Sequence, residues 1–184
     1  MTSYAKIYEM AADNYGLITN DQAHELGVST RNLNDLARRG RLIRLGFGVY
    51  QLAHYTPTEL DPYAQAVALA GPGAFLYGES VLALLDLTMT NPTRMYIGVP
   101  GRTRRRLNGG YRIRQFFSNA RTRTIEGIAA QIVPDAIRAA IPTVRSDRLV
   151  SAACEALRRG LIDEETRDGL VKELEQSSDH CQQR

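Results

Sequence analysis

The sequence lacks any apolar run long enough to span a membrane. Hydrophobic residues make up 43% and charged residues 23% of its 184 positions, a balance that is ordinary for a soluble globular protein. The opening residues, Met-Thr-Ser-Tyr-Ala-Lys-Ile, carry neither the basic start nor the apolar stretch of a secretory signal. We therefore expect a cytoplasmic protein that does not bind membranes.

Cysteine is scarce, with two in the chain. Cys154 falls within a helical pattern and Cys181 within a polar tail, a spacing that suggests neither a disulfide framework nor a zinc site. We expect both to be free thiols. The prediction is that the protein holds no metal ion and no cofactor.

Catalytic motifs are missing as well: there is no Walker loop, no GxGxxG, no H-E-x-x-H and no GxSxG. Gly78-Glu-Ser80 resembles the opening of a nucleotidyltransferase motif, but no acidic pair at alternate strand positions follows it to hold magnesium. We expect a helix start there. A nuclease would need an E-x-K strand, and neither Lys6 nor Lys172 has a glutamate two residues before it. We predict no catalytic residues and no enzymatic activity.

Those two lysines are the only ones among 23 basic residues. The arginines cluster: four fall together between Arg38 and Arg44, and nine lie between Arg94 and Ile125, with no acidic residue in either stretch. The planar guanidinium fork suits phosphates and guanine edges better than a lysine ammonium does. Two basic stretches flanking the acidic segment 53–93 favour an anionic partner, although a GC-rich genome would also raise the arginine content.

The first 52 residues follow the order of a helix-turn-helix and a hairpin. Apolar spacing predicts a helix over Tyr4–Tyr15, then a short buried connector at Leu17 and Ile18. Thr19-Asn-Asp-Gln22 matches a capping box that opens a second helix running to Leu26, and Gly27-Val28 makes the turn. Ser29 caps a third helix, whose outer stripe carries arginine and asparagine side chains suited to base edges in a major groove.

Two short strands, Arg41–Arg44 and Val49–Leu52, follow around the glycine-rich tip Leu45-Gly-Phe-Gly48 and predict a wing. Arg41 and Arg44 are expected to meet phosphates, while the outer stripe of the third helix selects the sequence. We expect His24 to be a surface residue. The predicted DNA-binding residues are Ser29, Thr30, Arg31, Asn32, Asn34, Asp35, Arg38, Arg39, Arg41, Arg44 and Phe47.

The predicted fold is α+β, with an N-terminal winged helix-turn-helix over residues 1–54 and a linker at 55–62 that contains Pro57 and Pro62. A mixed α/β domain with a small antiparallel sheet and C-terminal helices follows over 63–176, and 177–184 is predicted to be a disordered tail. Its helices are expected at 63–70, 79–87, 134–141, 146–159 and 164–175, and its strands at 94–99 and 111–117 with a hairpin at 122–132.

An arginine-dense loop lies between two of these predicted strands. Four arginines in 101–110 have no acidic neighbour and would repel one another unless an anion is near. The loop has two interpretations. It is a second contact surface, for the DNA backbone or for an acidic partner, or it is a solvated surface loop. Its candidate residues are Arg102, Arg104, Arg105 and Arg106.

Several segments together resemble the AbiEi family of antitoxins, the regulators of type IV abortive-infection toxin–antitoxin pairs. They are Gly16-Leu-Ile-Thr19, Leu26-Gly-Val-Ser-Thr30, Arg38-Arg-Gly-Arg-Leu-Ile-Arg44 with Gly48-Val-Tyr50, Tyr77-Gly-Glu-Ser-Val-Leu-Ala-Leu-Leu-Asp-Leu87 and Gly127-Ile-Ala-Ala-Gln-Ile-Val-Pro-Asp-Ala-Ile-Arg138. The wing is the most specific of these motifs and the C-terminal helices are the least.

The resemblance implies an N-terminal winged helix that represses its own operon and a C-terminal domain that opposes a nucleotidyltransferase toxin, with or without direct contact. It also implies cooperative binding to repeated operator sites in double-stranded DNA, by a monomer or a weak dimer. Many relatives have a longer C-terminal domain. The alternatives are a protein-binding adaptor that uses the winged helix and the arginine loop, and, less favoured, a small nuclease.

Overall fold

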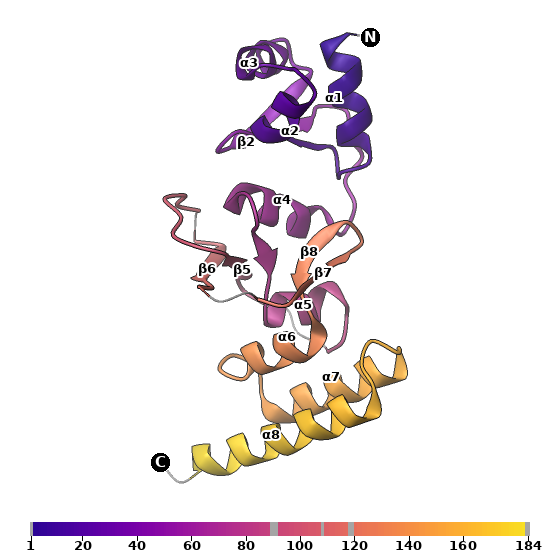
Figure 1. The fold of residues 1–184 in the computed structure, drawn as a ribbon, viewed down its shortest axis with the longest axis vertical. Helices are drawn as coiled ribbons and strands as arrows, with labels where there is room; N and C mark the ends of the chain where they lie inside the picture. The colour runs from indigo at the N-terminus through magenta and orange to yellow at the C-terminus, as the bar shows by residue number, and fades with distance from the viewer. Residues whose placement is uncertain (1, 89–91, 108, 118–119, 183–184) are drawn as a thin grey trace. The chain divides into compact units, whose positions relative to one another are not determined.

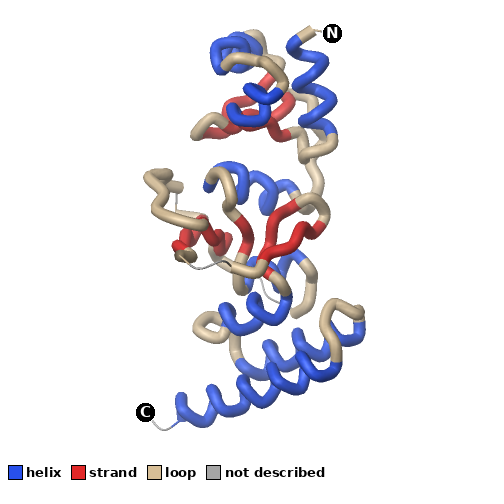
Figure 2. Tube along the Cα trace, viewed as in Figure 1, coloured by secondary structure: helices blue, strands red, loops and turns tan. Residues whose placement is uncertain are grey.

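The computed structural model describes residues 2–88, 92–107, 109–117 and 120–182. Contacts divide the chain into two units. The N-terminal unit holds the described residues up to Ala74 together with Thr103–Leu107, and the C-terminal unit holds the rest. Each unit mixes helices and strands (Figures 1 and 2). No helix in the described part of the chain is long and apolar enough to cross a lipid bilayer.

The N-terminal unit combines helices with a small antiparallel sheet. Its strands are β1 (Leu17–Thr19), β2 (Leu42–Gly46) and β3 (Val49–Leu52), paired in the order β1-β3-β2. Its helices are α1 (Ser3–Ala12), α2 (Asn20–Glu25), α3 (Thr30–Arg38) and α4 (Asp61–Ala70). The apolar core draws on α1, α2, α3 and all three strands, and is made of Ile7, Ala11, Ile18, Ala23, Val28, Leu33, Leu42, Tyr50 and Leu52.

Two features of this unit differ from the prediction. Helix α1 ends at Ala12 rather than at residue 15, because Tyr15 and Gly16 both take positive φ angles, 54° and 67°, which no helix continues. The predicted connector at 17–18 is part of strand β1, whose Ile18 pairs with Tyr50 of β3. A three-residue strand is too short to show a periodic pattern of apolar residues in the sequence. Whether the segment forms a strand therefore depends on its pairing with β3.

The predicted linker at 55–62 is held by a buried carboxylate. Asp61 is 4% exposed. Its Oδ1 accepts hydrogen bonds from the Thr58 amide at 2.9 Å and hydroxyl at 2.7 Å, and from the Tyr55 hydroxyl at 3.3 Å; its Oδ2 accepts one from Gln51 at 3.3 Å. Because Gln51 lies in β3, these bonds tie the segment and α4 to the N-terminal unit. The division therefore falls after Ala74, later than predicted.

The C-terminal unit is built on a mixed sheet whose described strands lie in the order β6-β5-β4-β8-β7. They are β4 (Phe75–Leu76), β5 (Met95–Val99), β6 (Tyr111–Gln115), β7 (Thr122–Ile125) and β8 (Ile128–Gln131). The predicted antiparallel sheet is present in part: β4 with β5 and β7 with β8 are antiparallel, but β5 with β6 and β4 with β8 are parallel. The two-residue strand β4 at the centre was not predicted.

Helices complete this unit: α5 (Glu79–Leu84), α6 (Val133–Ala140), α7 (Ser146–Arg158) and α8 (Glu164–Gln182). Helices α7 and α8 run side by side (Figure 1), and the larger core cluster is shared by α5 to α8. Gly78 caps α5, and the Ser80 hydroxyl accepts the Tyr96 amide at 2.7 Å, so Gly78-Glu-Ser80 is a helix start. Cys154 is a free, exposed thiol; the Cys181 side chain lies outside the described residues.

Helix α8 runs through Gln182, where helix only to 175 and a disordered tail over 177–184 were predicted. No proline or glycine follows Gly169, so no strong helix breaker stands in this stretch. Residues 183 and 184 of the predicted tail lie outside the described residues.

Candidate nucleic-acid interface

The turn between α2 and α3 is fixed by two side-chain caps and a glycine. The capping box at Thr19 and Gln22 is present, with both reciprocal hydrogen bonds formed. Gly27 takes a φ of +72°, which glycine adopts without strain. The Ser29 hydroxyl accepts the Asn32 amide at 3.3 Å and starts α3. The sequence predicted these capping contacts, because each depends on residues three positions apart.

Helix α3 presents one apolar face to the core and a polar face outward. Leu33 is fully buried, whereas Arg31, Asn32, Arg38 and Arg39 are exposed. Exposed guanidinium and amide groups on one helix are the donors and acceptors that pair with base edges in a major groove. The face is therefore accessible and chemically suited to nucleic acid.

Two predicted members of that face make contacts within the protein. Asn34 is half-buried, and its Oδ1 accepts a hydrogen bond from the Tyr50 hydroxyl at 2.9 Å. Since Tyr50 is buried in β3, this bond fixes the Asn34 side chain on the sheet and leaves Nδ2 as its donor to a ligand. Asp35 forms an ion pair with Arg38, so Arg38 would have to share or exchange its partner on binding a base.

The hairpin beside α3 carries the predicted phosphate contacts. Arg44 is exposed on β2. The Arg41 guanidinium lies over the Tyr4 ring of α1, 4.8 Å from the ring centroid, in a cation–π contact. Tyr4 thus positions Arg41, a role that the sequence did not predict because the two residues are far apart in the chain.

The tip of the hairpin is held against the start of α2. The Asn20 amide donates to the Gly48 carbonyl at 2.8 Å. Phe47, beside it, takes a φ of 47° and is 47% exposed, large for an apolar side chain. Phe47 is therefore presented outward at an anchored tip, as a side chain at the end of a nucleic-acid-binding wing would be.

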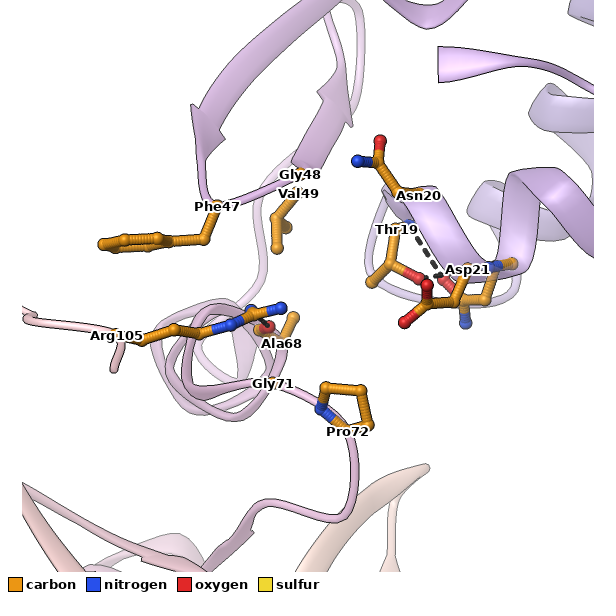
Figure 3. Close-up of a pocket in the computed structure, with 11 residues that line it drawn as sticks. Thr19, Asn20, Asp21, Phe47, Gly48, Val49, Ala68, Gly71, Pro72 and Arg105 are labelled. Atoms are coloured by element: carbon orange, nitrogen blue, oxygen red, sulfur yellow. Dashed lines mark hydrogen bonds between the residues drawn. The ribbon is translucent and has the colours of Figure 1, made fainter. Parts of the chain in front are cut away.

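The four predicted loop arginines divide by exposure. Arg102, Arg104 and Arg106 are exposed, whereas Arg105 is half-buried. Its Nη1 donates to the carbonyls of Ala68 at 3.4 Å and Leu69 at 3.0 Å, near the end of α4. Figure 3 shows its side chain extended between that helix and Phe47, whose ring centroid lies 5.9 Å from the guanidinium carbon. Arg105 is thus engaged inside the protein.

Arg105 also lines a pocket of about 320 Å³ with residues from α2, the hairpin tip and the end of α4 (Figure 3). Capping the last carbonyls of a helix is a common use of arginine. We therefore assign Arg105 a structural contact, and the arginines that remain exposed for the predicted second contact with an anion are Arg102, Arg104 and Arg106.

His24 is exposed, as expected of a surface residue, and its Nε2 lies 3.1 Å from the Thr30 hydroxyl at the start of α3. In the described part of the chain, no group of three or more His, Cys, Asp and Glu side chains is arranged to hold a metal ion.

Comparison with known proteins supports the resemblance in the N-terminal unit. Residues 6–53, from α1 to the end of β3, match the family described as transcriptional regulator, AbiEi antitoxin. Over those residues the family prediction is confirmed. No curated protein shows significant sequence similarity to the chain. A similar solved structure is that of the RV2827C protein from Mycobacterium tuberculosis, at 15% identity and a TM-score of 0.40, covering 94% of this chain and 81% of that one.

Proposed function

We propose that residues 1–54 form a winged helix-turn-helix that binds double-stranded DNA. The observation that carries this proposal is helix α3, which buries Leu33 and turns Arg31, Asn32 and Arg38 outward behind a capped turn. In this arrangement α3 enters the major groove and the β2–β3 hairpin follows the flanking backbone. The family match over residues 6–53, to transcriptional regulators, supports the same use.

Within this proposal the contacts fall into two classes. Arg31, Asn32 and Arg38 contact base edges, with Asn34 and Asp35 at the margin, and so set the sequence preference. The second class grips the backbone and adds affinity without sequence information. It comprises Ser29, Thr30, Arg39, Arg41, Arg44 and Phe47.

The exposed arginines Arg104 and Arg106 extend the backbone class. They belong to the segment 103–107, which is part of the same unit as α3. Exposure alternates along that segment: Arg104 and Arg106 are exposed, and Arg105 between them is hydrogen-bonded to the Leu69 carbonyl of α4. We propose that they neutralise phosphates, so each would add to the salt dependence of DNA binding.

On this basis the protein is an autorepressor and antitoxin of a toxin–antitoxin operon. It binds repeated sites upstream of its own gene and opposes a nucleotidyltransferase-type toxin, acting by binding rather than by catalysis. The family match, to antitoxin transcriptional regulators, supports this pairing of roles.

Fluorescence anisotropy with DNA from upstream of the gene tests the first half. The full chain should bind at moderate salt, and Arg31→Ala or Arg38→Ala should each weaken binding by about tenfold, as the loss of a base contact does. Arg123→Ala, an exposed arginine of β7 in the other unit, is the matched control. Absence of binding, or equal binding by all three variants, would contradict the proposal.

Co-expression with the neighbouring reading frame tests the second half. Growth arrested by that product should be restored by the full chain. It should also be restored by Arg31→Ala, since the antitoxin role is assigned to the C-terminal unit. Growth that stays arrested with the full chain would remove the antitoxin assignment and leave DNA binding as a separate result. Growth restored by the full chain but not by Arg31→Ala would contradict the assignment of that role to the C-terminal unit.

A further inference from the structure

A pocket of about 500 Å³ opens on the sheet of the C-terminal unit. Tyr77, Tyr96, Arg112 and Arg114 line it from the sheet side. Ala139 from α6, with Pro142 and Thr143 just beyond that helix, lines the other side. Its volume lies within the range of about 300–1,000 Å³ that small-molecule sites occupy.

The strand register puts both arginines on one face of the sheet. Arg112 pairs with Tyr96 and Arg114 pairs with Gly98 across the parallel ladder of β5 and β6. Side chains two residues apart in a strand point to the same face. Both arginines are exposed, and no Asp or Glu is among the residues that line the pocket. This wall therefore offers two guanidinium forks to an anion.

The floor beside the arginines is aromatic. Tyr77 and Tyr96 meet edge to face with ring centroids 5.7 Å apart, and Tyr77 meets Phe116 in the same way at 5.4 Å. Gly98 leaves room for two neighbouring rings, because a Cβ there would come within 2.5 Å of the Phe75 ring and 3.0 Å of the Phe116 ring. The sheet thus keeps a tightly packed aromatic floor under the pocket.

Electrostatics within the pocket agree with this placement. Burial raises the pKa of the Tyr77 hydroxyl, and the positive charges of Arg114 and Arg112 act on that pKa in the opposite direction. The charges of both arginines are therefore felt at the Tyr77 hydroxyl on the floor of the pocket.

We propose that this pocket binds a nucleotide. The Arg112 and Arg114 guanidinium groups hold the phosphates, since paired forks match phosphate oxygens. The planar base lies against Tyr96 and against the apolar wall of Ala139 and Pro142, and it displaces water from these surfaces. An inorganic phosphate would leave that wall unused. None of the residues that line this pocket is among the proposed DNA contacts, and all of them belong to the C-terminal unit.

Isothermal titration calorimetry of the full chain tests the inference, with ATP, GTP, CTP and UTP as probes and with tripolyphosphate and the corresponding nucleosides for comparison. At least one nucleotide should bind tenfold or more tightly than tripolyphosphate and its own nucleoside. Arg112→Gln and Arg114→Gln should each weaken it about tenfold, as loss of a charged hydrogen bond does. Arg123→Gln, on the opposite edge strand of the same sheet, should leave the affinity unchanged.

Three results would overturn the inference: no nucleotide bound at millimolar concentration, tripolyphosphate bound as tightly as the nucleotides, or affinities unaffected by either arginine variant. Binding of a single-stranded oligonucleotide without binding of mononucleotides would do so as well. Arg112→Gln and Arg114→Gln should keep the anisotropy response to upstream DNA. A failure of nucleotide binding is thereby distinguished from a failure of the DNA-binding proposal.

Discussion

Gly40 and Gly48 have similar backbone angles but different surroundings. Both take positive φ angles, +69° and +76°. A Cβ at Gly40 would meet nothing within 4 Å, whereas a Cβ at Gly48 would come within 2.6 Å of Asn20 Nδ2 and 2.9 Å of its Cγ. The first glycine therefore serves only the backbone angle, and the second also permits the close approach that anchors the hairpin tip.

Substitution separates these two effects. Gly40→Ala should lower the free energy of unfolding of the N-terminal unit by about 1–2 kcal/mol, the strain of a left-handed residue. Gly48→Ala should lower it by at least about 1 kcal/mol more, because Asn20 must also move. Hydrogen exchange of core amides such as that of Tyr50 measures both losses in the full chain. Equal losses would show that Asn20 moves without strain.

At the scale of an element, the side chain of Arg159, at the end of α7, ties that helix to the end of α5 and is itself held by Glu155. Glu155 accepts hydrogen bonds from Arg158 at 2.6 and 2.7 Å and from Arg159 at 2.5 Å. Arg159 in turn donates to the carbonyls of Leu85 at 2.8 Å and Asp86 at 3.0 Å. The bonds from Arg158 and then Arg159 lower the pKa of the Glu155 carboxyl to about 2.

This depressed pKa predicts acid weakening of the C-terminal helices. An unfolded glutamate takes up its proton near pH 4.5, while folded Glu155 stays charged down to about pH 2. Between these values the unfolded state binds more protons, so stability is present above pH 4.5 and falls as the pH is lowered toward 2. Urea unfolding followed by circular dichroism should show that Glu155→Gln reduces this pH dependence.

Glu59→Gln is the control for that measurement, because Glu59 is an exposed carboxylate in the N-terminal unit. It should leave the pH dependence of C-terminal unfolding as it is in the unchanged chain. A pH profile for Glu155→Gln that matches the unchanged chain would mean that Glu155 does not contribute to acid unfolding.

The elements that the sequence predicted well are those specified by nearby residues. Thr19 and Ser29 cap their helices through residues three positions away, and the glycines around Phe47 make the hairpin tip. The missed features depend on distant partners. Strand β1 exists through β3, and the 55–62 segment is ordered by Asp61 and Gln51. Arg105 belonged by composition to a loop of exposed arginines, and only its contact with α4 sets it apart.

For the whole molecule, salt dependence separates the two classes of proposed DNA contact. Each phosphate neutralised by an arginine contributes about 0.9 to the slope of log affinity against log salt concentration. Arg44→Gln should therefore reduce the slope by about 1 and weaken all DNA sequences alike. Arg31→Gln should instead reduce the ratio of the affinity for upstream DNA to the affinity for unrelated DNA. Anisotropy titrations at several salt concentrations measure both.

A slope unchanged in Arg44→Gln would remove the hairpin from the phosphate contacts. Arg104→Gln and Arg106→Gln, measured in the same series, test the second backbone surface in the same terms. Binding insensitive to salt throughout would favour the protein-binding adaptor instead.

The anchoring of Arg105 also bears on how genes for such proteins can be rearranged. The N-terminal unit is assembled from two separate pieces of chain, and the second lies between β5 and β6. A gene fusion cut at residue 74 would carry α4 away without the guanidinium that caps its last carbonyls. If relatives exchanged this unit as one contiguous segment of chain, the C-terminal end of α4 would therefore fray. It would stay ordered only where the recipient protein supplied another hydrogen-bond donor to these carbonyls.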